Sequence, residues 1–260
     1  MLLATIIDFP LRFYIGPLTI GSHLFFEIMA FFVGFRYFTH LRKQQKDHIS
    51  TDNRIWILIG AAGGALIGSR VVGSLEYPWL FITGGGEMGF LYYYKHKTIV
   101  GALLFGYWGV ELTKKIIGVT RSSGDLFAFP IILGMMIGRV GCFTTGVYEQ
   151  TYGIESTLPW AMDLGDGLLR HPTALYEIIF LLLLWLGIRA LEKRYTLVNG
   201  ARFKIFLMSY FAYRLLIEFI RPGIVVLGGM TSIQWACIVG VLSYFPTLIK
   251  LKTSIILNKN

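Results

Sequence analysis

Seven long apolar stretches alternate with shorter polar links along the chain. Most of the stretches are about 17 to 22 residues long, and a helix of about 20 apolar residues crosses a hydrocarbon layer about 30 Å thick. The pattern predicts an all-α, polytopic membrane protein with about seven transmembrane helices, forming a single integral-membrane domain over residues 1–260. The predicted spans are residues 21–41, 54–75, 97–113, 126–143, 173–191, 203–220 and 231–249.

The composition agrees with a membrane protein, and the distribution of Lys and Arg predicts how that protein is oriented in the membrane. Only 15% of the 260 residues are charged, against roughly 25% in soluble domains. The net charge of +9 could suggest a nucleic-acid partner. However, fifteen Lys and Arg residues fall in the C-terminal tail and in the links after the first, third and fifth spans, against five on the opposite side. The positive-inside rule then predicts an outer N-terminus and a cytoplasmic C-terminus, with the basic charge facing anionic lipid and no nucleic acid bound.

The two longest links of the predicted outer side are candidate functional segments. Residues 76–96 contain the glycine-rich run TGGGEMG and predict a flexible outer arm, whereas residues 144–172 are acidic and predict a small extramembrane cap. Chemistry is therefore expected at the outer face. The two cysteines, Cys142 and Cys237, lie within predicted spans and show no metal-ligand spacing, so no disulfide, metal or cofactor is expected.

Arg139 is a charge within the apolar run LFAFPIILGMMIGRVGCF. A charge at membrane depth costs about 2.5–3.5 kcal/mol on insertion scales, and such residues usually mark a functional site. Because Gly138 and Gly141 shield it little, an anion could approach closely, and a guanidinium binds phosphate in a bidentate manner. The alternative is a structural ion pair with a carboxylate on another span.

Further charges lie in the second and sixth spans. Arg70 lies in LIGSRVVG, and Arg214 and Glu218 lie four residues apart in AYRLLIEFIRP, on one helical face. Arg221 follows directly. We interpret Glu218 as a partner that orients an arginine rather than as a catalytic base.

Two histidines near outer span ends are candidate bases. His23 and Glu27 are also four residues apart, which fits either a proton acceptor or a polar pair that faces the bundle. His171 lies in RHPTALYE, five residues before Tyr176, and precedes a proline, so a capping or hinge role competes with substrate contact.

Glycines recur in the second span at Gly60, Gly64 and Gly68. This spacing favours close helix packing, with the passage of a lipid tail as the alternative.

Taken in order, Arg70, GRVGCF, TLPWAMDLGDGLLRHPTALYE and RLLIEFIRP resemble the prolipoprotein diacylglyceryl transferases of bacterial inner membranes, most closely over residues 138–177. The resemblance implies a multi-pass inner-membrane enzyme that moves the diacylglyceryl group of phosphatidylglycerol onto the lipobox cysteine thiol of a prolipoprotein, releasing glycerol phosphate. Its partners would be phosphatidylglycerol, lipobox peptides and membrane lipids. It implies catalytic roles for Arg139, Arg214 and Glu218. The expected phospholipid contacts are Arg139, Arg70, Gly138, Gly141, Cys142, His171, Tyr176 and Arg221.

The chain departs from the family pattern at several positions. The usual His-Gly-Gly motif corresponds to Val100, Gly101 and Ala102, and the signature asparagine corresponds to Cys142. A usual tyrosine and a usual glutamate correspond to Phe25 and Val147. Either a thiol beside a buried arginine ionises without a dedicated base, or His23 with Glu27, or His171, accepts its proton. The alternative functions are a seven-span phospholipid-binding or carrier protein and a transferase-like paralogue with an altered acceptor.

Overall fold

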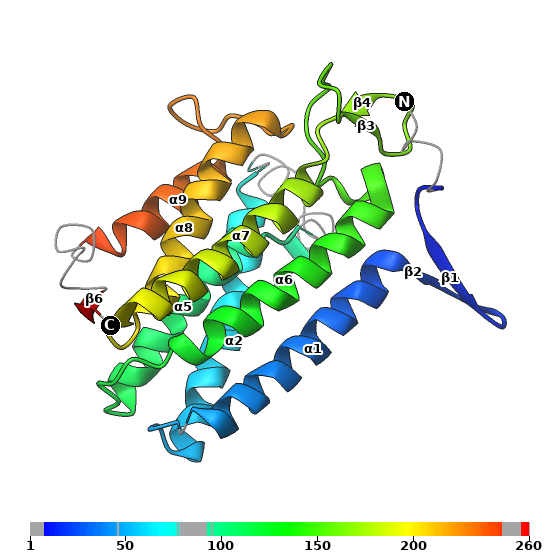
Figure 1. Ribbon diagram of the computed structural model, residues 1–260. Coiled ribbons are helices and arrows are strands. Elements are labelled where there is room, and N and C mark those ends of the chain that lie inside the picture. Colours follow the sequence, from blue (N-terminus) through cyan, green and yellow to red (C-terminus); the bar gives the residue numbers. More distant parts are fainter. Residues whose placement is uncertain are drawn as a thin grey trace.

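The computed structural model describes residues 8–45, 47–76, 78, 93–94, 96–245 and 256–259, and most of this chain is helical. A helix occupies each of the seven predicted stretches, and the helices run side by side along one direction (Figure 1). Two short 3-10 helices directly follow two of these helices: η1 (Gly146–Glu149) follows α6 (Asp125–Thr145), and η2 (Glu218–Ile220) follows α8 (Ala201–Ile217). The helices are α1 (Ser22–Gln44), α2 (Thr51–Ser74), α5 (Ile99–Ile116), α6 (Asp125–Thr145), α7 (Thr173–Arg194), α8 (Ala201–Ile217) and α9 (Ser232–Leu242).

The described part of the chain is mostly helical, as the sequence predicts, and it also contains three small antiparallel ribbons. They pair β1 (Arg12–Ile15) with β2 (Leu18–Gly21), β3 (Met162–Asp163) with β4 (Leu169–Arg170), and β5 (Tyr195–Leu197) with β6 (Ile256–Lys259). The β1–β2 ribbon precedes α1, the β3–β4 ribbon lies between α6 and α7, and the β5–β6 ribbon joins the link after α7 to residues near the C-terminus. Turns reverse the chain within the first two ribbons. At the β3–β4 turn, for example, Gly165 and Gly167 have positive φ angles of 110° and 78°, which L-residues rarely adopt.

The link between α6 and α7, predicted as the cap, holds η1 and the β3–β4 ribbon. The carboxylate of Asp163 organises its turn by accepting the backbone N–H groups of Gly165, Asp166 and Gly167 at 2.8 to 3.2 Å. Most of the predicted arm, residues 76–96, lies outside the described residues.

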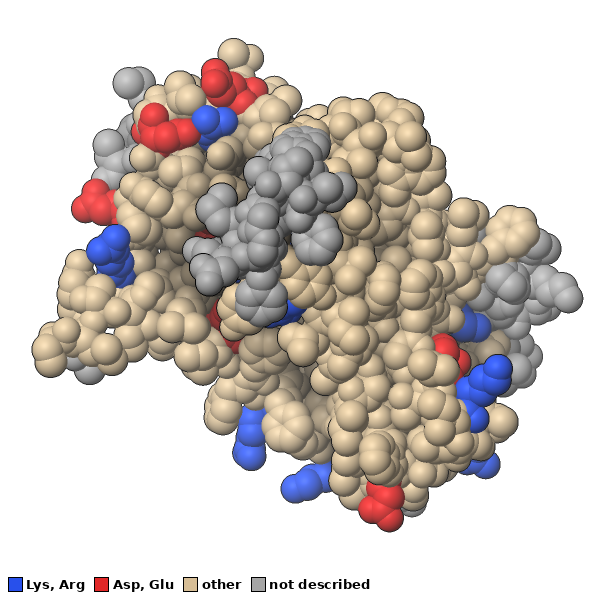
Figure 2. All heavy atoms as spheres, turned by 180° about the vertical axis from the view of Figure 1, so that it is seen from behind, with Lys and Arg blue, Asp and Glu red and all other residues tan. Residues whose placement is uncertain are grey.

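Within the described residues, four helices are long and apolar enough to cross a membrane: Ser22–Gln44, Thr51–Ser74, Asp125–Glu149 and Thr173–Arg194. Large apolar side chains face outward along them; Phe31 on α1 is 75% exposed and Leu183 on α7 is 61% exposed. Figure 2 shows most of the charged side chains of one face toward the two ends of the molecule, with an uncharged expanse between them. These features identify a membrane protein, and crossing by all seven helices remains a prediction.

The glycines of α2 serve helix packing, as favoured by their spacing. A Cβ atom on Gly68 would lie 2.5 Å from the carbonyl oxygen of Gly101, and one on Gly60 would lie 2.9 Å from that of Gly109. Real Cβ atoms do not come so close, so only glycine lets the backbones of α2 and α5 approach in this way.

Helix α6 occupies a central place in the bundle because it packs against α1, α7 and α8. The wall between α6, α7 and α8 contains fully buried side chains such as Phe129, Leu181 and Tyr210. The charged side chains of Glu177 on α7 and Arg214 on α8 are buried in the same region.

Candidate functional site

A buried carboxylate on α7 bridges two of the predicted arginines. Oε1 of Glu177 lies 2.8 Å from Nε of Arg139 on α6, and Oε2 lies 3.4 Å from Nη1 of Arg214 on α8. The hydroxyl of Tyr210 also donates to Glu177, at 2.9 Å. Glu177 is only 2% exposed. The ion-pair alternative for Arg139 is thus realised in this structure.

A second carboxylate extends this cluster toward the end of α8. Nη2 of Arg214 lies 3.0 Å from Oε2 of Glu218, and Nη1 of Arg221 lies 3.2 Å from the same oxygen. Nη2 of Arg221 donates to the backbone carbonyl of Gln150 at 3.0 Å. The i, i+4 pairing predicted for Arg214 and Glu218 is therefore present, and it brings Arg221 with it.

We call the five charged residues the arginine network: Arg139, Arg214, Arg221, Glu177 and Glu218. Its three guanidinium groups face two carboxylates, so it has one positive charge in excess. In addition, Nε of Arg214, Nε of Arg221 and the hydroxyl of Tyr213 are buried without a hydrogen-bond partner in the described part of the chain. Buried donors without partners are costly, and an oxyanion would satisfy both the donors and the charge.

Glu76 modulates that charge from the end of α2. Burial raises the pKa of the Glu76 carboxyl from 4.5 to about 7. The negative charge of Glu218 acts in the same direction, and the positive charge of Arg221 acts against it. The carboxyl is therefore about half ionised at neutral pH. At lower pH it is neutral, and the excess positive charge of the network is then fully available.

A second cluster joins α1 to the end of α6. The sulfur of Cys142 lies 3.7 Å from Nη1 of Arg139 and 3.9 Å from Nδ1 of His23. The same His23 nitrogen lies 3.4 Å from Oε1 of Glu149, and Nε2 lies 3.9 Å from Oε2 of Glu27. His23 thus has two carboxylate neighbours, whereas the sequence pattern indicated only Glu27.

Glu27 is shared with a lysine that precedes α5. Its Oε1 lies 2.9 Å from Nζ of Lys97. Glu149, on η1, has no such cation partner among the described residues apart from His23. Glu149 is therefore the more available carboxylate for the imidazole.

The two glycines that flank Arg139 differ in their surroundings. A Cβ atom on Gly141 would lie 2.9 Å from Cβ of Phe26 and 3.3 Å from Cα of His23, so Gly141 lets α1 approach α6. A Cβ on Gly138 would meet nothing within 4 Å. Gly141 thus brings His23 to Cys142, and Gly138 leaves open space beside Arg139.

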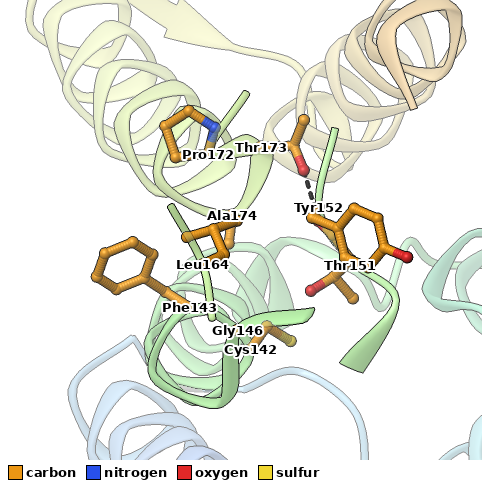
Figure 3. A pocket seen from close by; sticks show the side chains of 9 residues that line it. All are labelled: Cys142, Phe143, Gly146, Thr151, Tyr152, Leu164, Pro172, Thr173 and Ala174. Carbon is orange, nitrogen blue, oxygen red and sulfur yellow. Dashed lines mark hydrogen bonds between the residues drawn. The ribbon is translucent and has the colours of Figure 1, made fainter. Parts of the chain in front are cut away.

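Cys142 also lines a small recess beneath the link between α6 and α7. Figure 3 shows its sulfur on the opposite side of this recess from Pro172 and Thr173, with Thr151 and Tyr152 beside it. The recess has a volume of about 10 Å³, which is room for about one water molecule.

Three of the predicted substrate-binding residues form their hydrogen bonds outside the arginine network. Nδ1 of His171 lies 3.1 Å from the hydroxyl of Tyr176, which also accepts a hydrogen bond from Nε1 of Trp160 at 2.7 Å. Arg70 donates to the hydroxyl of Ser69 at 3.2 Å, and it forms no ion pair with any residue the structure describes. Contacts of these residues with phospholipid remain predictions.

Glu177 is the most informative residue that the sequence analysis missed. It is the last residue of RHPTALYE and begins the apolar run of α7, so the criterion applied to the arginines, a charge at membrane depth, would also have selected it. Tyr210 and Glu149 carried no comparable signal, since their contacts join helices far apart in sequence.

A family model described as prolipoprotein diacylglyceryl transferase matches residues 10–249. A phosphatidylglycerol–prolipoprotein diacylglyceryl transferase of Wolbachia pipientis is 31% identical over 228 residues, which cover 82% of this chain and 81% of the relative. Proteins of the same name from Trichormus variabilis and Bordetella avium are 28% and 29% identical, covering 89% and 87% of this chain and 86% and 88% of their own lengths. The chain therefore belongs to the prolipoprotein diacylglyceryl transferase family and is a transferase.

Proposed function

We propose that this enzyme transfers the diacylglyceryl group of phosphatidylglycerol to the lipobox cysteine thiol of prolipoproteins, forming a thioether and releasing glycerol phosphate. Three similar proteins carry that activity in their names. The reaction needs a site that holds one phosphodiester anion within a membrane and stabilises more negative charge as the phosphate leaves.

The arginine network is the observation that carries this proposal. Its single excess positive charge matches the single negative charge of a phosphodiester. The unpartnered Nε atoms of Arg214 and Arg221 are buried donors that phosphate oxygens would satisfy. As the carbon–oxygen bond breaks, the leaving phosphate gains charge, and preorganised donors stabilise that charge most in a water-poor site.

Within this site, Arg139 and Arg214 bind the phosphate, and Glu218 orients Arg214 and Arg221. His23, supported by Glu27 and Glu149, takes part in the proton transfer of the reaction. The position at which the family usually has a histidine is Val100 here, which is fully buried in the core.

The remaining predicted contacts surround this centre. We propose that Arg70, Gly138, Gly141, Cys142, His171 and Tyr176 contact the phospholipid. The chain would cross the bacterial inner membrane seven times, with its N-terminus and the 144–172 cap outside, and would meet its lipobox substrate at the outer face.

The direct test incubates purified protein with phosphatidylglycerol vesicles and a lipobox peptide, followed by mass spectrometry for a diacylglyceryl adduct on the peptide cysteine. A peptide with serine in place of that cysteine is the control. Lipid that co-purifies and binds without forming any adduct would contradict the transferase proposal and support the carrier alternative.

Arg139→Lys tests the phosphate role. Lysine keeps the charge but lacks the planar guanidinium, which can donate to Glu177 and to a phosphate at the same time. We therefore expect the rate to fall by about 10²–10³, as for loss of one charge-stabilising donor. Arg36→Lys, on the exposed surface of α1, is the matched control and should keep the wild-type rate. A near-normal rate for Arg139→Lys would remove Arg139 from the mechanism.

A further inference from the structure

We propose that Cys142 and His23 form a thiolate–imidazolium pair that carries the proton of the transfer reaction. Cys142 takes the proton from the acceptor thiol, and His23 gives a proton to the departing phosphate. This inference rests on the proposed function and assigns its acid–base step.

The first support is the position of the sulfur between the guanidinium of Arg139 and the imidazole of His23. Arg139 lies at 3.7 Å and His23 at 3.9 Å, and Cys142 is only 7% exposed. Neighbouring cations stabilise a thiolate relative to a thiol. The guanidinium of Arg139 is charged at all accessible pH values, so part of this stabilisation is permanent.

The second support is the set of groups around His23. Glu149 on η1 faces Nδ1 and Glu27 on α1 faces Nε2, at 3.4 and 3.9 Å. Opposite charges beside both ring nitrogens favour the protonated ring. Among the described residues, two further charges contact this group: Arg139 on α6 lies beside the sulfur, and Lys97 pairs with Glu27.

Cys142 and His23 together then account for each proton that the reaction moves. The Cys142 thiolate removes the proton of the acceptor thiol, and the new acceptor thiolate attacks the glycerol carbon as its bond to the phosphate oxygen breaks. The His23 imidazolium protonates the departing glycerol phosphate. Proton transfer from Cys142 to His23 across their 3.9 Å contact restores the starting pair. No covalent bond to Cys142 forms at any step.

Lipid binding makes this base stronger. Arg139 contacts the Cys142 sulfur and also belongs to the arginine network. A bound phosphodiester takes up the excess positive charge of the network, so the thiolate loses part of its stabilisation and gains proton affinity. The base is therefore most effective when the diacylglyceryl donor is in place. The recess beside Cys142 has room for about one sulfur atom or water molecule.

Infrared spectroscopy of the S–H stretch tests the ion pair without needing activity or reagent access. The chain has two cysteines, and Cys237 is fully buried in the core of α9, so the Cys142→Ser and Cys237→Ser variants assign the bands. At pH 7 we expect only the Cys237 thiol band. His23→Gln should restore a second band. Two S–H bands in the wild-type protein between pH 6 and 8 would overturn the proposal.

Kinetics test the role of the pair in the reaction. Cys142→Ser should lower kcat with the lipobox peptide at least 100-fold at pH 7, in the range of general acid–base contributions. Its remaining rate should rise about tenfold per pH unit below the acceptor thiol pKa of about 8.5. Cys237→Ser makes the same chemical change in a buried site and should keep the wild-type kcat and pH profile.

The outcomes separate this inference from the proposed function. Adduct formation by the wild type together with an unchanged kcat and pH profile in Cys142→Ser overturns the proton-transfer pair and leaves the transferase activity in place. Absence of adduct from the wild type overturns the proposed function and, with it, the role of the Cys142–His23 pair in proton transfer. The S–H band then still decides whether the thiolate–imidazolium pair exists.

Discussion

Glu177→Gln should be the most destabilising isosteric substitution of a single charge in the described bundle. The variant keeps the size of the side chain and removes the charge that faces Arg139 at 2.8 Å and Arg214 at 3.4 Å. Glu177 has a side-chain exposure of 3%, so water cannot compensate the two guanidinium groups. Breaking a buried pair by removing one partner costs about 3–5 kcal/mol.

Asp166→Asn is the matched control because its ion pair has the same length. Nη2 of Arg170 lies 2.8 Å from Oδ2 of Asp166, but the side chain of Asp166 is 27% exposed. Exposed pairs contribute about 0–1 kcal/mol. The two sites differ in burial and in the number of guanidinium partners, two for Glu177 and one for Asp166, so the pair of variants compares a buried bridge with an exposed ion pair.

Thermal unfolding in detergent micelles, followed by circular dichroism, provides the measurement. With roughly 2–4 °C per kcal/mol for a chain of this size, Glu177→Gln should lower Tm by about 6–20 °C and Asp166→Asn by at most about 4 °C. Equal shifts for the two variants would refute the reasoning, because they would show that burial does not increase the importance of the Glu177 charge.

Two further predictions concern packing and pH. Gly68→Ala should destabilise the bundle by about 1–3 kcal/mol, the usual cost of overpacking, because the new Cβ would collide with α5. The control is Gly63→Ala on the same helix, whose Cβ would meet nothing within 4 Å. It should lower the free energy of unfolding by less than a third as much in the same unfolding assay. Burial raises the pKa of Glu76 to about 7, so its ionisation adds negative charge beside Arg221 as the pH rises. If only the neutral form of Glu76 permits lipid binding, the affinity for phosphatidylglycerol vesicles should fall roughly tenfold between pH 6 and 8. Glu76→Gln should flatten this dependence; an unchanged pH profile in the variant would exclude Glu76 as its source.

The positions of the helices could be predicted from the sequence because each depends on a local run of residues. A stretch of about 20 apolar residues forms a helix wherever backbone groups have no water to bond. The Arg214–Glu218 pair was equally accessible, since residues four apart share one face of any helix. The glycine spacing in α2 predicted close packing, although not the identity of its partner, α5.

The composition of the site depended on contacts between distant parts of the chain. Glu177 and Arg214 are 37 residues apart, and His23 and Cys142 are 119 residues apart. No local periodicity reports such contacts. The short ribbons of the links were also missed, because pairs of two to four residues form only where turns and neighbouring helices hold them together.

The amino-acid sequence by itself therefore determined the membrane class of this protein, the places of its helices and the family signature around Arg139. The tertiary structure decided which charges neutralise one another. A buried charge is stable only when its partners surround it in three dimensions, and the packing of α1, α6, α7 and α8 alone places Glu177 between two arginines and Cys142 between Arg139 and His23.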